Sequence, residues 1–187
     1  MRSRGFIRTL CGMAAAATLF AAIGAPVLVA QTPDSKEISS LLLKAKTDAA
    51  LAADDAATLQ SYTMSTLSWQ SHTARINEIT EHVNALGKLN QQLGDLRSEG
   101  SPWQQVAIDR IDPLLRDMAN QLTATIKRLN DHPNQIHMQP YREYVSATHE
   151  FATRTYDTIR DFVDYDRAKA TVERLEAKLE LPAHEAE

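Results

Sequence analysis

Histidines are the side chains of this sequence best suited to chemistry, because imidazole titrates near neutral pH and binds metal ions and haem iron. Helical bundles that hold two metal ions place a glutamate three residues before a histidine on facing helices. The residue three positions before His72, His82 and His149 is Trp, Ile and Ser, respectively. The H-E-x-x-H zinc motif is also missing. The sequence therefore predicts no metal-binding residues.

Two other histidines, His132 and His137, lie in a segment predicted to be a loop, where nothing in the pattern imposes a metal geometry. A methionine and a histidine on facing helices can bind haem, and the candidate pair is Met64 or Met118 with His149. Since buried methionine usually fills gaps in a core, we predict no cofactor. A four-helix bundle that binds haem non-covalently, or a metal, is the alternative function.

Motifs of nucleophilic and phosphate chemistry are missing as well. There is no G-x-S-x-G sequence and no glycine-rich phosphate loop. The single cysteine, Cys11, falls in the N-terminal segment considered next, so the chain after it offers no thiol nucleophile, disulfide or thiolate metal site. The paired carboxylates Asp54 and Asp55 are interpreted as solvated residues of a helix. We therefore expect a non-enzymatic protein with no catalytic residues.

Residues 1–30 have the layout of a secretory signal peptide. Three arginines and no acidic residue precede an apolar run from Leu10 to Ile23, and small residues follow as far as Ala30. No two arginines are adjacent, so we expect export by the general secretory route, with cleavage after Ala30 and release to the periplasm or outside the cell. The alternative is an uncleaved membrane anchor. The stretch from Leu10 to Ala30 is about long enough to cross a bilayer, but Gly24 and Pro26 interrupt it and favour cleavage.

Cleavage changes the charge of the chain. The whole sequence has 20 basic and 24 acidic residues, and loss of three arginines leaves 17 against 24, a net charge of −7 with neutral histidines. Nucleic acids and anionic membranes attract basic patches. We therefore expect no nucleic-acid partner and no stable membrane insertion after cleavage.

Residues 31–187 are predicted to form one all-α domain, an antiparallel bundle of about four helices. No segment alternates apolar and polar residues in the manner of a strand. The helices are expected at about 35–60, 67–98, 102–131 and 140–180. Hydroxyl-bearing and β-branched residues between Gln60 and Ser68 predict a break between the first two helices. The alternative is one helix over 35–98, which would be unusually long.

The helix over 102–131 carries the clearest signals. Ser101 and Gln104 match an S-x-x-Q capping box, and Pro102 suits the first helical position. Apolar residues then recur at a coiled-coil spacing, and Pro113 predicts a kink. The residues of this apolar seam are Ile108, Ile111, Leu115, Met118, Leu122, Thr125 and Leu129.

The short turn at Gly100 predicts that helices 67–98 and 102–131 lie antiparallel, with Gly100 in a left-handed conformation. The register about this turn pairs Leu86 with Leu115 and places Asn90 opposite Ile111. His72 falls on the same apolar face, where we interpret it as a hydrogen-bonded core residue rather than a ligand.

Two features could provide a binding groove for a protein or peptide. Gly87 and Gly94 share one helix face, and we favour tight internal packing there, with Gly87 making room for the kink at Pro113. The other feature is the aromatic face of the last helix, whose spacing favours a core role. Its aromatic residues are Tyr141, Tyr144, Phe151, Tyr156 and Phe162.

The apolar pattern of the last helix continues beyond Asp166 in a highly charged segment, which either projects past the bundle or bends back. Together these features predict an interaction or structural protein of the cell envelope. The sequence leaves the oligomeric state open.

Overall fold

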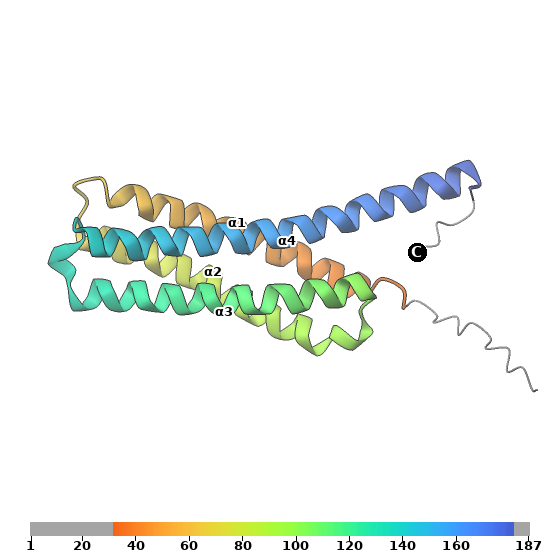
Figure 1. Ribbon diagram of the computed structural model, residues 1–187, viewed down its shortest axis with the longest axis horizontal. Helices are drawn as coiled ribbons and strands as arrows, with labels where there is room; N and C mark the ends of the chain where they lie inside the picture. Colours follow the sequence, from red (N-terminus) through yellow and green to blue (C-terminus); the bar gives the residue numbers. More distant parts are fainter. Residues whose placement is uncertain (1–31, 182–187) are drawn as a thin grey trace, which may run out of the picture. The chain divides into compact units, whose positions relative to one another are not determined.

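The computed structural model describes residues 32–181, and all the regular secondary structure in that range is helical. The all-α prediction is therefore confirmed, and the helix boundaries differ from the predicted ones by no more than three residues. The predicted signal peptide, residues 1–30, lies outside the described residues. The elements, shown in Figure 1, are α1 (Lys36–Tyr62), α2 (Trp69–Asp95), η1 (Arg97–Glu99), α3 (Pro102–Asp131), η2 (Pro133–Gln135) and α4 (Gln139–Leu179).

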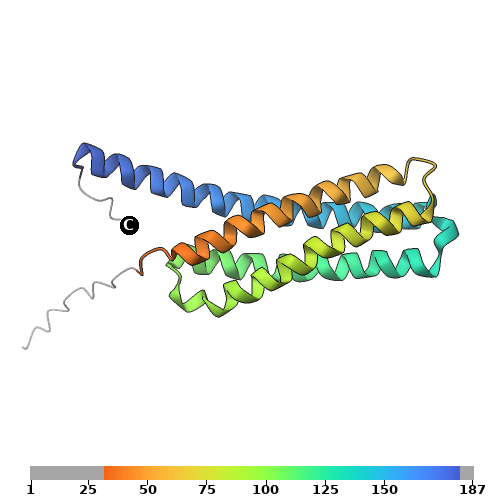
Figure 2. The ribbon, with the colours of Figure 1, turned by 180° about the vertical axis from the view of Figure 1, so that it is seen from behind.

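Each α-helix packs against two others. α1 contacts α2 and α4, and α3 contacts the same two helices. Consecutive helices run antiparallel, as the ribbons in Figures 1 and 2 show from opposite sides. α1 and α4 are antiparallel as well, since Lys46 contacts Asp164 whereas Gln60, further along α1, contacts Ser146, further back along α4. This is the arrangement of an antiparallel four-helix bundle.

The core is built from the apolar seams that the sequence predicts. All seven residues of the predicted seam of α3 are buried. On α1 the buried face is rich in alanine, and its alanines are at most 1 % exposed, so the helix can approach its neighbours closely. The buried alanines of α1 are Ala45, Ala49, Ala52 and Ala56.

The break between α1 and α2 has a visible cause in hydroxyl side chains. The Ser61 hydroxyl donates to the Thr58 carbonyl at 2.7 Å, and the Thr63 hydroxyl donates to the Gln60 carbonyl at 2.8 Å. Such bonds compete with the helical ladder for the same carbonyls. α1 ends at Tyr62, so the prediction of two separate helices is confirmed.

The predicted start of α3 is confirmed. Ser101 is the N-cap, Pro102 is the first residue of the helix, and the Gln104 side chain accepts a hydrogen bond from the Ser101 N–H at 3.1 Å. α3 then continues through Pro113 as one helix to Asp131. The register of α2 on α3 also agrees with prediction within one residue, because Asn90 donates to Asp112, the neighbour of Ile111, at 2.8 Å.

The predicted roles of the glycines are wrong. Gly87 and Gly94 are exposed, and a Cβ added to either would meet no atom within 4 Å, so neither permits a close approach or makes room for Pro113. Gly100 has φ −79° and ψ 151°, an extended rather than left-handed conformation. It is buried, and a Cβ there would lie 2.9 Å from Cδ1 of Ile38. Closeness to α1 therefore explains Gly100.

α4 divides into a packed part and a projecting part. Its packed part buries one face, which includes Tyr141, Val145 and Ile159. From Ala170 to Leu179 nearly every residue is exposed, and Figures 1 and 2 show this end running beyond the other three helices. The charged end of α4 therefore projects and does not bend back. No helix within residues 32–181 combines the length and hydrophobicity required to span a membrane.

Candidate functional site

His72 lies in the first turn of α2 and is completely buried. Its Nδ1 is 3.0 Å from the Tyr141 hydroxyl on α4, and its ring packs beside the rings of Tyr62 and Tyr141. Among the described residues, no group forms a hydrogen bond with its Nε2. His72 is therefore a hydrogen-bonded core residue, as predicted.

Burial controls the protonation of this pair. It lowers the pKa of His72 below its ordinary value of 6.5, and the nearby His137 acts in the same direction, whereas the backbone carbonyl of Tyr62 opposes them. Burial also raises the pKa of Tyr141. Both side chains are therefore neutral at neutral pH. They form a structural link between α2 and α4.

The other candidate ligands lie in separate environments. His132 and His137 are exposed on either side of η2, and His149 is partly exposed, with its Nδ1 3.5 Å from the Thr153 hydroxyl. Met64 is 76 % exposed in the turn after α1, whereas Met118 is buried in the core. Within residues 32–181, no group of three or more His, Cys, Asp or Glu side chains is placed to hold a metal ion.

A buried carboxylate joins α1 to α2. Asp55 is only 9 % exposed, accepts a hydrogen bond from the Arg75 guanidinium and lies 3.4 Å from Nε2 of His82. Arg75 also contacts Glu78 and lies over the ring of Tyr62. A buried carboxylate with a cationic partner of this kind is a structural ion pair between two helices.

The interpretation of Asp54 and Asp55 as solvated carboxylates is correct for Asp54, which is exposed, and wrong for Asp55. The sequence contained a signal for this difference. Asp55 lies three residues after Ala52 and four before Leu59, both buried, so helical periodicity places it on the core side of α1.

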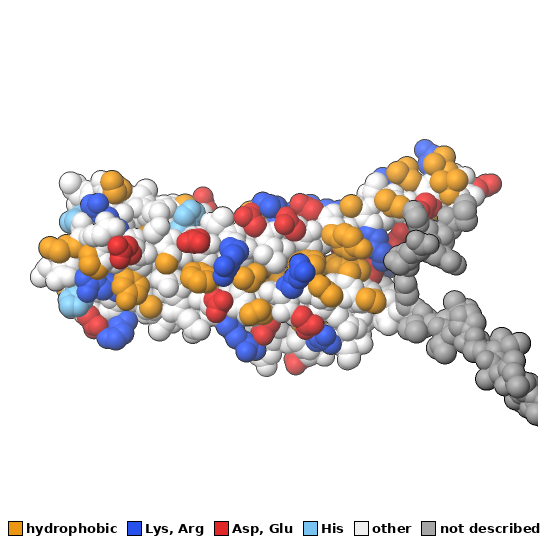
Figure 3. All heavy atoms as spheres, viewed as in Figure 1, with side chains coloured by type: hydrophobic (Ala, Val, Ile, Leu, Met, Phe, Trp, Pro, Cys, Tyr) orange, Lys and Arg blue, Asp and Glu red, His pale blue; other side chains and the backbone are white. Residues whose placement is uncertain are grey.

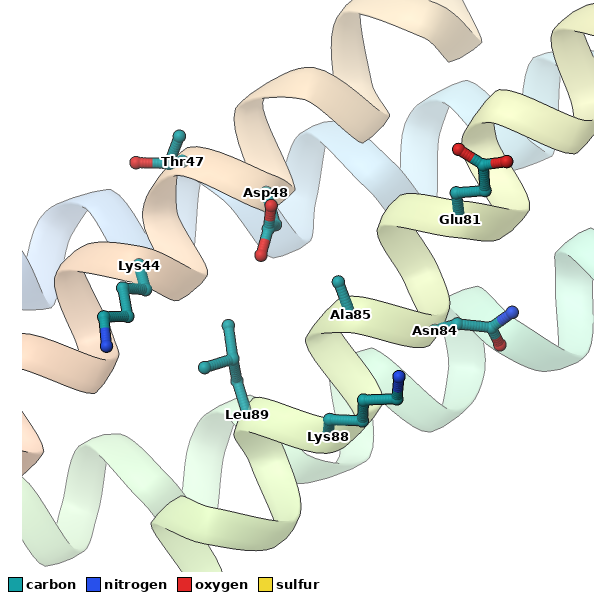
Figure 4. A pocket seen from close by; sticks show the side chains of 8 residues that line it. All are labelled: Lys44, Thr47, Asp48, Glu81, Asn84, Ala85, Lys88 and Leu89. Carbon is teal, nitrogen blue, oxygen red and sulfur yellow. The ribbon is translucent and has the colours of Figure 1, made fainter.

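An open hollow between α1 and α2 is lined mainly by polar residues (Figure 4). In Figure 4, Asp48 of α1 and Leu89 of α2 point into the space between the helices. The two lysines and two carboxylates of its lining balance in charge, and the lining includes no histidine, cysteine or serine. This hollow offers no arrangement for catalysis. Its lining residues are Lys44, Thr47, Asp48, Glu81, Asn84, Ala85, Lys88 and Leu89.

A more apolar groove of about 530 Å³ runs between the start of α3 and the second half of α4. We call it the α3/α4 groove. Val106 is 47 % exposed and Tyr165 is 51 % exposed, and Figure 3 shows hydrophobic side chains gathered over this part of the two helices. Its lining residues are Pro102, Trp103, Val106, Arg110, Thr158, Asp161, Phe162 and Tyr165.

Trp103 is held in place at the edge of this groove. Its indole Nε1 donates to Asp34 at 2.7 Å, and its ring lies edge-on to that of Tyr165 with 5.3 Å between the centroids. Burial by itself would raise the pKa of Asp34, but the hydrogen bonds donated by Lys169 and Trp103 outweigh it and lower the pKa. Asp34 is therefore a stable anion that fixes the indole, so the aromatic wall of the groove is preformed.

An exposed apolar stripe continues from the groove along the projecting end of α4. Its members recur at alternating spacings of three and four, which keeps them on one side of the helix. We call it the α4 stripe, and it consists of Tyr165, Ala168, Val172, Leu175 and Leu179. Val172, Leu175 and Leu179 are 48 %, 46 % and 62 % exposed.

Of the two predicted groove features, only the aromatic face of α4 overlaps the α3/α4 groove, and it does so at one residue, Phe162. The sequence signal for the groove was the spacing of Trp103, Val106 and Arg110, which lie outside the buried seam of α3. Of the predicted aromatic face of α4, Tyr141 is buried and serves the core, whereas Phe162 lines the groove. Comparisons with protein-family models, curated proteins and solved structures found no match.

Proposed function

We propose that this protein is an exported, non-enzymatic interaction protein of the cell envelope, and that its α3/α4 groove binds an amphipathic helix. The observation that carries the proposal is the exposed, preformed aromatic wall made by Trp103 and Tyr165. An amphipathic helix binds such a groove through apolar side chains on consecutive turns. Tryptophan, tyrosine and arginine contribute strongly to protein interfaces, and the groove contains all three.

The groove is better suited to binding than to catalysis. Trp103 is already oriented by Asp34, so a ligand would not have to immobilise it. Arg110 and Asp161 bring charges of opposite sign to an otherwise apolar lining and supply a polar rim. None of the eight lining residues is a histidine, cysteine or serine, the usual nucleophiles and bases of hydrolytic sites.

Export is supported by the N-terminal sequence. Three arginines, an apolar run and small residues precede Gln31.

The binding proposal can be tested by site-specific photo-crosslinking in the source cells. A photoreactive phenylalanine analogue replaces Val106 or Tyr165 in the groove, and the same analogue at exposed Gln91 of α2 is the control. We expect discrete light-dependent adducts at the groove positions and none at Gln91. Adducts that are absent, or equally abundant at all three positions, would contradict the proposal.

The export proposal has a separate test. Intact-mass measurement of protein recovered from outside the inner membrane should give a chain that begins at Gln31. Recovery of the full-length chain, or of the protein only inside the cell, would refute export without affecting the groove.

A further inference from the structure

We propose that the α4 stripe, which continues from the edge of the α3/α4 groove, is covered by α4 of a second copy of the chain. In this dimer the projecting ends of two α4 helices pair antiparallel, and each α4 stripe is covered by the other. The inference goes beyond the proposed function, because it concerns the stripe and not the interior of the groove.

The first argument is the state of the projecting helix. From Thr171 to Leu179 every residue of α4 except Glu176 is exposed, so this last part of the helix lacks the packed face that stabilises the rest of it. Most helical stability in proteins comes from packing of an apolar face. The half-exposed Val172, Leu175 and Leu179 form such a face without a partner.

The second argument is self-complementarity. A twofold axis pairs a surface with the same surface of the other copy. If one residue contacts a second residue of the other copy, that second residue must therefore also contact the first across the axis. With Val172 opposite Leu175 of the other copy, Leu179 falls opposite Ala168 of the other copy, where the small side chain leaves room. Leu179, the last residue of each stripe, then lies about one helical turn from Tyr165 of the other copy, at the edge of its groove.

The third argument is charge. Lys169 and Glu176 flank the same side of the stripe, as the positions next to its apolar residues do in a two-stranded coiled coil. In the antiparallel register, Lys169 of each copy lies beside Glu176 of the other copy. The dimer therefore contains this pair of opposite charges twice. Lys169 also bonds Asp34, the residue that orients Trp103, and this contact holds the base of the projecting segment against the bundle.

The charge of this segment favours a second copy over a membrane surface as the partner of the stripe. Helices that lie on membranes carry an excess of Lys and Arg beside their apolar face. Residues 164–180 include five acidic and four basic residues, with both signs mixed along the segment. The acidic residues are Asp164, Asp166, Glu173, Glu176 and Glu180, and the basic residues are Arg167, Lys169, Arg174 and Lys178.

Sedimentation velocity of the purified exported protein, over about 1 to 100 µM, tests association. We expect a concentration-dependent dimer that Leu175→Glu weakens at least about 100-fold, because the change would bury a charge. Leu51→Glu is the matched control, since Leu51 of α1 has the same 46 % exposure as Leu175, and it should leave the dimer unchanged. A monomer at all concentrations, or equal effects of the two variants, would overturn the inference.

Disulfide trapping tests the relative orientation of the two α4 helices. Cys11 is the sole natural cysteine, so the only disulfides formed in its absence join introduced cysteines. In a Cys11→Ser background, Val172→Cys and Leu175→Cys chains are prepared separately and then mixed. Antiparallel pairing predicts that mixed disulfides form faster than those within either pure sample. Faster formation in the pure samples would indicate a parallel pair and contradict the proposed register.

The sedimentation and crosslinking results together show whether the second copy, the helix-binding groove or both must be rejected. A monomeric protein whose groove crosslinks to a different protein would refute the second copy and retain the helix-binding groove. Binding to vesicles of anionic lipid, lost in Leu175→Glu and retained in Leu51→Glu, would refute the second copy, since the stripe would then serve a membrane. A dimer with self-adducts at Tyr165 would support both proposals.

Discussion

Ser35 and Gln104 are joined by two hydrogen bonds that run in opposite directions. The Ser35 N–H donates to Oε1 of Gln104 at 2.9 Å, and Nε2 of Gln104 donates to the Ser35 carbonyl at 2.9 Å. The same side chain also accepts from the Ser101 N–H and donates to the Ser39 hydroxyl. Gln104 is completely buried, so this one amide connects the start of α1 to the start of α3.

Replacement of this amide should destabilise the bundle. Gln104→Ala would leave the buried backbone groups of Ser35 and Ser101 without their partners, and we expect the free energy of unfolding to fall by about 2 kcal/mol. Urea unfolding measures the change. The matched control, Gln91→Ala at an exposed position of α2, should change stability by less than about 0.5 kcal/mol. Equal effects at the two positions would show that Gln104 is not a structural link.

Of the three glycines in the described residues, two should respond to alanine in the opposite way to the third. Gly87 lies in the interior of α2 and Gly94 in its last turn, and both are exposed with free space for a Cβ. Alanine should therefore stabilise the protein by about 1 kcal/mol at Gly87 and by less at Gly94. Gly100→Ala should destabilise it by about 1–3 kcal/mol, because the Cβ would clash with Ile38. Thermal unfolding of the three variants checks the signs, and a stabilising Gly100→Ala would contradict the packing described.

The adjacent residues Asp54 and Asp55 provide a controlled comparison. Asp55→Ala removes the partner of Arg75 on α2, and we expect a loss of about 2 kcal/mol. Asp54→Ala, at an exposed site in the same turn of α1, should cost less than about 0.5 kcal/mol. Chemical denaturation of both variants measures the difference. Similar losses would mean that the ion pair between α1 and α2 contributes little.

His72 should make stability depend on pH. Its pKa is lowered in the folded protein, so below pH 6.5 the unfolded chain binds a proton that the folded one does not. The contribution of His72 is therefore complete above pH 6.5. It decreases as pH falls towards the folded pKa, by up to about 1.4 kcal/mol per pH unit.

Urea unfolding at about pH 7.5 and pH 5.5 measures this dependence. The natural protein should lose more stability between these values than His72→Gln does, because glutamine does not titrate. His132→Gln, at an exposed position, should behave as the natural protein does. A pH dependence that is the same in His72→Gln as in the natural protein would refute the assignment.

The helical fold could be predicted because its signals are local. The capping box of Ser101 and Gln104 and the seam of α3 depend on residues within a few turns of one another. The hydroxyl-rich end of α1 is local in the same sense, since Ser61 and Thr63 bond to carbonyls three residues away. These features need no knowledge of the neighbouring helices.

The glycines and the charged residues show where local reasoning fails. Gly87 and Gly94 suggested a packed face, but the rotation of α2 against its neighbours places them in solvent. Asp55 looked like its exposed neighbour, but Arg75 and His82 approach it from another helix. Which face of a helix is covered depends on where the other helices lie, and no single helix contains that information.

By itself, then, the sequence determined the all-α class, the positions of four helices and the antiparallel register of α2 on α3, because caps, periodicity and short turns act over a few residues. Only the tertiary structure decided where the apolar surface remains. The α3/α4 groove requires Trp103 and Tyr165, far apart in the chain, to meet at 5.3 Å, with Asp34 orienting the indole. The α4 stripe is exposed because α4 extends beyond the helices that would otherwise cover it. How much of α4 the other three helices cover depends on how all four pack together.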